Sequence, residues 1–154
     1  DRAEVATYAQ SQGVKAHGMN LGGRYVFPFG SVKFVPALHS SGYEIDGVMT
    51  YMGEASGIIL EAEDKKIYHA GDTALFSDMR LFAKDKSIDV AFLPIGDNYT
   101  MGPEDALEAV SYLNPKITIP IHYNTFPVIQ QNPAIFVEQV VGGKVLNPGE
   151  TILV

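Results

Sequence analysis

The stretch that decides the fold is His69-Ala70-Gly71-Asp72-Thr73, which follows an apolar run at residues 56–60 and a polar turn. This order predicts a β-hairpin whose second strand leads to the carboxylate of Asp72. A carboxylate at the end of a buried strand is costly to desolvate unless a cation meets it. No Lys or Arg lies between Lys66 and Arg80, so the sequence favours a metal ion as the partner of Asp72.

The composition is that of a folded protein without a surface for polyanions. Of the 154 residues, 46% are hydrophobic and 19% are charged, and the formal net charge is -7. This length fits one domain with a real core, so we expect residues 1–154 to form a single domain. The longest apolar run, residues 90–95, is far below the roughly 18 residues that indicate a transmembrane span. No basic cluster occurs, and nucleic acid is therefore not an expected partner.

Cysteine is absent, which limits the chemistry of any metal site. Disulfides and thiolate ligands are excluded, so a metal must bind to His, Asp, Glu or backbone oxygen. The chain opens inside a predicted helix that Gly13 ends. Asp1 is not a natural start, and we expect a further N-terminal segment to precede it.

Strands and helices mix along the chain, which predicts an α/β or α+β fold with a mixed sheet. Besides the hairpin at the central stretch, we expect strands at residues 24–29, 32–37, 88–95, 117–121, 145–146 and 151–153. A polar loop is expected over residues 40–53. The later helices are expected at 73–80 with Thr73 as the cap, from Pro103 to Asn114, and at 133–141.

Three of the predicted strands end close to a residue that can bind a metal. These residues are His39, Asp72 and His122. Ligands gather at strand ends in α/β sheets, because the loops there vary without disturbing the core. Two imidazoles and one carboxylate suit zinc or a harder first-row metal. Each His taken alone is as well explained by an ordinary hydrogen-bonded role, so the pattern by itself leaves both interpretations open.

Three further residues have less direct interpretations. His17 precedes a Gly-rich loop and is expected at the surface. His69 is expected to support the site structurally rather than to bind the metal. Asp97 follows a buried strand, and two roles stay open for it. It either accepts a hydrogen bond from a ligand His or caps the turn at Asn98.

Five segments together resemble the metallo-β-lactamase superfamily: residues 39–41, 69–73, 93–98, 101–106 and 121–126. The two motifs Gly-Asp-Thr at 71–73 and His-Tyr-Asn-Thr-Phe at 122–126 are specific for this superfamily when they occur together. More narrowly, the chain is similar to small, largely uncharacterised metal-dependent hydrolases. Those proteins are related to ascorbate-phosphate lactonase and to N-acylphosphatidylethanolamine phospholipase D. The resemblance covers essentially the whole chain, in order.

The resemblance implies a four-layer αββα sandwich with a dinuclear metal site at one edge. It implies that His39 binds the first metal, that Asp72 bridges both, and that His122 binds the second. Asp72 and His122 are thus the expected catalytic residues, and two divalent ions are the expected cofactors. Zinc is the first expectation, with manganese, nickel or iron as alternatives. The residues expected on the substrate side of the site or behind its ligands are Ser40, His69, Asp97, Asn124 and Thr125.

One motif of the family is absent from this chain. The first metal motif, His-x-His-x-Asp-His, does not occur in residues 1–154. The resemblance therefore implies a metallo-β-lactamase-type fold without its N-terminal portion. We expect a longer parent protein, or a complementary chain, to supply the missing segment and the remaining ligands.

The resemblance implies a metal-dependent hydrolase that uses a metal-activated water. The bond attacked is an ester, lactone, amide or phosphodiester of a small-molecule substrate. One alternative is a non-catalytic fragment or descendant of the fold without a complete metal centre. The other is a small-molecule phosphodiesterase or a nuclease. The absence of Cys and the resemblance favour a cytoplasmic location, and a homo-oligomer is compatible with both.

Overall fold

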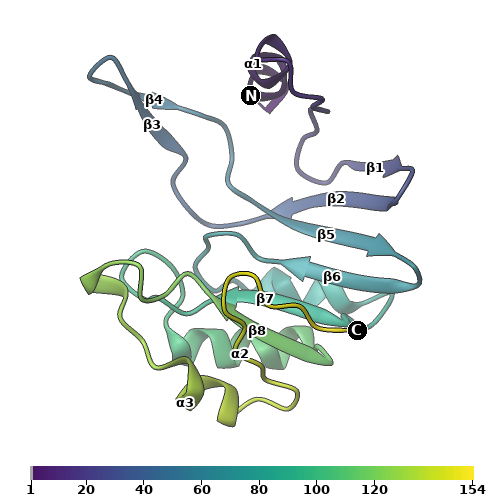
Figure 1. Cartoon of the computed structure of the whole chain (residues 1–154), viewed down its shortest axis with the longest axis vertical. Coiled ribbons are helices and arrows are strands. Elements are labelled where there is room, and N and C mark those ends of the chain that lie inside the picture. The colour runs from purple at the N-terminus through teal and green to yellow at the C-terminus, as the bar shows by residue number, and fades with distance from the viewer. Residues whose placement is uncertain (1) are drawn as a thin grey trace.

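A six-stranded mixed sheet forms the centre of the computed structural model, which describes residues 2–154 (Figure 1). In spatial order the strands are β1 (Arg24–Phe27), β2 (Gly30–Pro36), β5 (Ser56–Ala62), β6 (Lys65–His69), β7 (Val90–Pro94) and β8 (Ile117–Ile121). Strands β1, β2, β5 and β6 pair in antiparallel fashion, whereas β6, β7 and β8 are parallel. This mixed sheet with its helices confirms the predicted fold class, and β5 and β6 form the predicted central hairpin.

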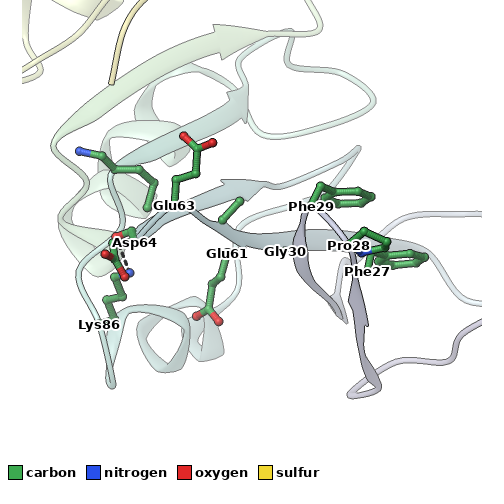
Figure 2. A pocket seen from close by; sticks show the side chains of 10 residues that line it. Phe27, Pro28, Phe29, Gly30, Glu61, Glu63, Asp64 and Lys86 are labelled. Atoms are coloured by element: carbon green, nitrogen blue, oxygen red, sulfur yellow. Dashed lines mark hydrogen bonds between the residues drawn. The ribbon is translucent and has the colours of Figure 1, made fainter.

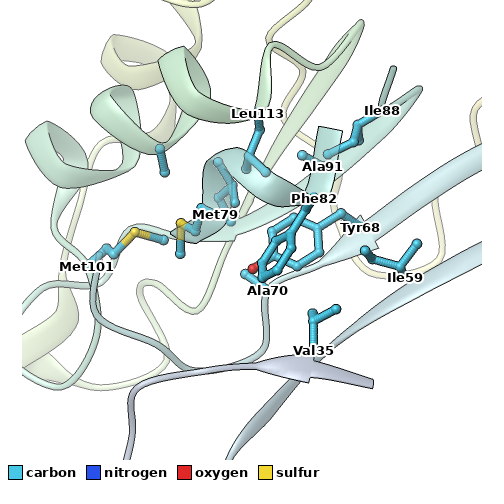
Figure 3. Close-up of a cluster of buried hydrophobic side chains, with 12 residues drawn as sticks. Val35, Ile59, Tyr68, Ala70, Met79, Phe82, Ile88, Ala91, Met101 and Leu113 are labelled. Carbon is cyan, nitrogen blue, oxygen red and sulfur yellow. The ribbon is translucent and has the colours of Figure 1, made fainter. Parts of the chain in front are cut away.

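One face of the sheet packs against helices. The 3-10 helix η1 (Ser77–Ala83) lies against α2 (Pro103–Leu113) on this side. The main core of the molecule is made where these helices meet β6 and β7 (Figure 3). Its large side chains are Ile59, Tyr68, Met79, Phe82, Ile88, Leu93, Met101 and Leu113. The short helix α3 (Pro133–Glu138) adds a second cluster, in which Phe136 packs with Ile95.

The other face of the sheet is apolar but less covered. Phe34, Ile58, His69, Phe92 and Ile119 lie opposite one another in register across β2, β5, β6, β7 and β8. Ile58 is 38% exposed on this face, whereas its neighbour in sequence on the helical face is 4% exposed. An apolar face of this kind is what a further layer of a sandwich would bury. The four-layer arrangement remains an expectation for a full-length protein that carries this chain.

A second, two-stranded sheet stands where a loop was expected. Strands β3 (Gly42–Ile45) and β4 (Val48–Tyr51) form an antiparallel hairpin that projects from the main sheet (Figure 1). Its turn is Asp46-Gly47, and both residues have positive φ, at 50° and 79°. Such a pair is the usual connection of a two-residue hairpin. The prediction of a loop over 40–53 was wrong, because this turn lets the flanking segments pair as strands.

Three other expectations also differ from the structure. The helix expected at 73–80 with Thr73 as its cap is instead η1, and Phe76 precedes its first residue. Helix α3 ends at Glu138, three residues before the expected 141. No strand forms at 145–146 or 151–153, since no strand within residues 2–154 pairs with them. Helix α1 (Arg2–Ser11) ends just before Gly13, as predicted, while Asp1 lies outside the described residues.

The start of β7 carries a buried carboxylate. Asp89 is 3% exposed and accepts hydrogen bonds from the backbone N–H of Lys66 at 2.8 Å and from Nζ of Lys116 at 2.7 Å. The bond from Lys116 holds the pKa of Asp89 below its usual range, and the backbone bond from Lys66 acts in the same direction. Asp89, directly before β7, thereby connects Lys66 of β6 with Lys116, the residue before β8.

Asp89→Asn is expected to lower the free energy of unfolding by about 1–2 kcal/mol at pH 7, because it removes the charge that Lys116 faces. The pKa of Asp89 is lower in the folded state than in the unfolded state. The stabilisation is therefore complete above about pH 5 and is lost as the pH falls through the folded-state pKa. Urea unfolding at several pH values checks this. Glu63→Gln, on an exposed turn, is the control and should change stability by less than about 0.5 kcal/mol.

Candidate metal site

The predicted site residues follow strands that end at the same edge of the sheet. Strands β6, β7 and β8 are parallel, and β2 runs in the same direction, because β5 is antiparallel to both β2 and β6. The carboxyl ends of all four strands therefore lie on one side. His39, Asp72, Asp97 and His122 come shortly after β2, β6, β7 and β8 respectively. No helix within residues 2–154 is long and apolar enough to span a bilayer.

Asp72 and His122 face each other at this edge. Oδ2 of Asp72 lies 3.8 Å from Nε2 of His122, and their side chains are 50% and 22% exposed. This separation is too long for a hydrogen bond. Ligand distances of about 2.1 Å around a tetrahedral ion place two ligand atoms roughly 3.4 Å apart. An imidazole nitrogen and a carboxylate at this spacing fit one side of a divalent-metal site.

The imidazole of His122 is held mainly by packing. The residue has a φ of 54°, in the left-handed region, directly after β8. Its Nδ1 atom is buried and has no hydrogen-bond partner within residues 2–154. The ring therefore presents Nε2 toward Asp72, while its other nitrogen lies against protein atoms.

Thr73 connects three loops at the site edge. The backbone N–H of Leu38 donates to Oγ1 of Thr73 at 2.9 Å, and the N–H of Ala74 donates to the carbonyl of Leu38 at 3.0 Å. The N–H of Met101 donates to the carbonyl of Thr73 at 2.9 Å. Sequence reasoning missed this role and treated Thr73 as a helix cap. The only local signal is a small polar residue directly after the carboxylate of the central stretch.

His39 lies next to this connection but does not complete a cluster. Its neighbour Leu38 is bonded to the segment after Asp72, while Nδ1 of His39 lies 2.7 Å from the carbonyl of Ser40. Within residues 2–154, no three His, Cys, Asp or Glu side chains are grouped so that they could hold a metal ion. The structure thus brings two of the three predicted ligands together, and the set of three stays a prediction.

His69 makes contacts that fix the turn before Asp72. Its Nδ1 accepts a hydrogen bond from the N–H of Gly71 at 3.1 Å, and its ring stacks on Phe92 with 5.6 Å between centroids. Desolvation by the surrounding protein lowers the pKa of His69, and the carboxylate of Asp72 opposes this shift. The contacts are structural, and the expected role of His69 beside the ligands stays a prediction.

The remaining candidates lie on loops at the same edge. Oδ1 of Asp97 accepts from the N–H of Asn98 at 2.8 Å, which is the turn-capping role; a bond to a ligand His stays a prediction. Oδ1 of Asn124 accepts from the N–H of Gln131 at 2.7 Å and closes the loop that follows β8. The substrate-side candidates Ser40, Asn124 and Thr125 are exposed.

Two cavities help to locate the site. The cavity in Figure 2, of about 520 Å³, lies at the turns that join β1 to β2 and β5 to β6, away from the carboxyl ends of β6, β7 and β8. Its Glu61 pairs with Arg24, and its Lys86 donates to the carbonyl of Asp64. A second cavity, of about 630 Å³, borders His122 and the turn at residues 146–150. The second one thus lies on the His122 side of the site, since His122 lines it and Asp72 does not.

The family model and the related sequences that match this chain agree on one family. A model of the beta-lactamase superfamily domain matches residues 1–123. A UPF0173 metal-dependent hydrolase of Enterococcus faecalis is 97% identical over 152 residues, which are 99% of this chain and 68% of the relative. One from Bacillus cereus is 54% identical over 153 residues, covering 97% of this chain and 67% of the relative. The chain spans about two thirds of the length of these relatives.

Solved structures show the same fold. Igni18, a metallo hydrolase from the archaeon Ignicoccus hospitalis, aligns with a TM-score of 0.83 and 35% identity. The alignment covers 97% of this chain and 65% of Igni18. An isothiocyanate hydrolase from Delia radicum gut bacteria aligns with a TM-score of 0.72 at 19% identity, over 99% of this chain and 64% of that one. At this identity the second likeness shows the fold alone.

Proposed function

This chain belongs to the UPF0173 metal-dependent hydrolases of the beta-lactamase superfamily, and we propose that it supplies Asp72 and His122 to a hydrolytic metal centre in a full-length protein. The observation that carries the proposal is the 3.8 Å approach of Oδ2 of Asp72 to Nε2 of His122. The two groups come from strand ends 50 residues apart in sequence, at the edge where four strands of one direction stop.

The proposed roles follow from the donor atoms. A divalent ion bound here would lower the pKa of a water and polarise the bond to be cleaved. Asp72 offers two oxygens, which allows it to serve two ions, and His122 offers Nε2. His39 is the proposed third ligand, because the bonds of Leu38 to Thr73 and Ala74 fix the strand end before it. Zinc is the first choice for these donors, ahead of manganese, nickel or iron.

The proposed substrate is a small molecule with an ester, lactone, amide or phosphodiester bond. Ser40, Asn124 and Thr125 are exposed on the loops that flank the Asp72–His122 pair, which supports their proposed place on the substrate side. The net charge of -7 and the lack of a basic cluster make a nucleic-acid substrate the less favoured choice.

A second candidate function is a non-catalytic member of the fold. The observation in its favour is that no group of three metal-binding side chains occurs within residues 2–154. In this candidate the Asp72–His122 pair would be a structural contact of the sheet edge. The two candidates differ in whether a full-length protein holds metal.

Removal of metal from a full-length protein that carries this chain tests the proposal. Dialysis against a chelator is expected to lower hydrolysis at least about a hundredfold, because the ion supplies several kcal/mol of charge stabilisation. Zinc or manganese should restore it. The assay is a screen over lactones, phosphodiesters and acyl amides, with metal content measured by elemental analysis. Absence of bound metal would contradict the proposal and favour the non-catalytic candidate. Full hydrolysis by the metal-free protein would contradict the proposed role of the metal.

A further inference from the structure

The backbone of Gly96 lies directly beside His122. Strands β7 and β8 are parallel neighbours, and Pro94 is paired with Ile121 at their ends. The N–H of Ile95 donates to the carbonyl of Ile121 at 3.1 Å, as expected for this parallel pairing. Gly96 follows Ile95 after β7, and His122, whose φ is in the left-handed region, follows Ile121 after β8.

The space beside Gly96 is filled by His122. A Cβ atom on Gly96 would lie 2.3 Å from the carbonyl oxygen of His122, 3.0 Å from its Nδ1 and 3.1 Å from Cβ of Ile129. Cβ contacts below 3.0 Å essentially do not occur in proteins. The φ of Gly96 is not in the left-handed region, so its conformation does not demand glycine. The absence of a side chain matters here because of space.

We infer that Gly96 is a positioning residue. Because it has no side chain, the backbone and ring of His122 can pack directly against it, and this packing keeps Nε2 of His122 toward Asp72. The same missing Cβ touches both the carbonyl and the ring of His122, so filling it would move the backbone and the ring together. No hydrogen bond to Nδ1 within residues 2–154 holds the ring in place, which leaves packing to do so. The inference rests on the proposed function, because a metal ligand needs its position fixed within about 0.5 Å.

Gly96→Ala in a full-length protein tests the inference through the ring of His122. The ring ¹H–¹⁵N signals of His122 should shift in the metal-free protein, and zinc affinity should fall about 10–100-fold, as when a ligand loses its support. Gly23→Ala is the matched control. It also brings a Cβ close to a backbone carbonyl, 2.9 Å from the oxygen of Asn20, but beside β1 at the far edge of the sheet. The control should leave both readouts unchanged.

The H122G background separates positioning from a general effect on folding. There the ring is absent and residue 122 can turn freely, so adding G96A should lower zinc affinity by less than about twofold. An equal loss of affinity in both backgrounds would overturn the inference. If G96A alone does not fold, recovery of folding in the G96A/H122G double variant supports it, and loss of folding in both overturns it.

The test distinguishes this inference from the proposed function. An unmodified protein that binds none of zinc, manganese, nickel and iron contradicts the proposed function. The His122 ring signals of the metal-free variants still decide whether Gly96 positions the ring. Unshifted signals in folded G96A would overturn the inference even where zinc binds tightly to the unmodified protein.

Discussion

Asp72→Ala in a full-length protein that carries this chain is expected to lower hydrolysis roughly a thousandfold and to remove at least one bound ion. Asp72 is the carboxylate that faces Nε2 of His122, and its side chain is half exposed at the sheet edge. A metal-bound water loses several kcal/mol of stabilisation when its ion is lost, and each 1.36 kcal/mol is a factor of ten in rate. Hydrolysis rate and elemental analysis of the purified variant check this result.

Asp78→Ala is the control for the Asp72 experiment. Asp78 is an exposed carboxylate in η1 whose Oδ1 lies 3.2 Å from Oγ of Ser77. Its removal should leave metal content and rate within a factor of two of the unmodified protein. Asp72→Asn adds a test of charge, since it keeps the size of the side chain. Unchanged metal content in both Asp72 variants would contradict a bridging role for this residue.

The parts of the fold that the sequence predicts well are those set by local patterns. The apolar run at 56–60 and the polar turn that follows the run predict β5 and β6. The predicted strand at 88–95 is observed as β7 over Val90–Pro94. These strands are predicted correctly because a buried strand is a continuous run of apolar residues bounded by turn residues, and this pattern is visible in the sequence. The Asp46-Gly47 turn is an equally local signal, because this residue pair is typical of the two-residue turn that joins β3 to β4.

The parts that the sequence could not predict depend on contacts between distant segments. The role of Thr73 comes from bonds to Leu38 and Met101, which are 35 and 28 residues away. Residues 151–153 have strand composition, but a strand exists only beside a partner that pairs with it. At the site, the pattern of strand ends predicted which residues share an edge. The direction of each side chain there depends on packing, as for His122 against Gly96.

His39→Ala is expected to lower zinc affinity about a hundredfold in a full-length protein, whereas His69→Ala should lower it less, by about tenfold. His39 follows β2 at the site edge, and its side chain is exposed. His69 uses Nδ1 to hold the N–H of Gly71 and stacks its ring on Phe92, which makes it a support of the turn. Loss of a ligand should cost at least as much affinity as the 10–100-fold that loss of an outer support costs.

The two His variants are matched, since each removes an imidazole from a strand end at the same edge of the sheet. Calorimetric zinc titration measures the affinity, and thermal unfolding of the metal-free proteins measures the effect on the fold. His69→Ala should lower the unfolding temperature more than His39→Ala, because the ring of His69 stacks on Phe92 of the neighbouring strand, whereas the contact of His39 is to the next residue. If His69→Ala lost more zinc affinity than His39→Ala, His69 would be the ligand and His39 the supporting residue. Equal, small losses in both would leave Asp72 and His122 without a third ligand from this chain, and the remaining ligands would then have to come from outside residues 1–154.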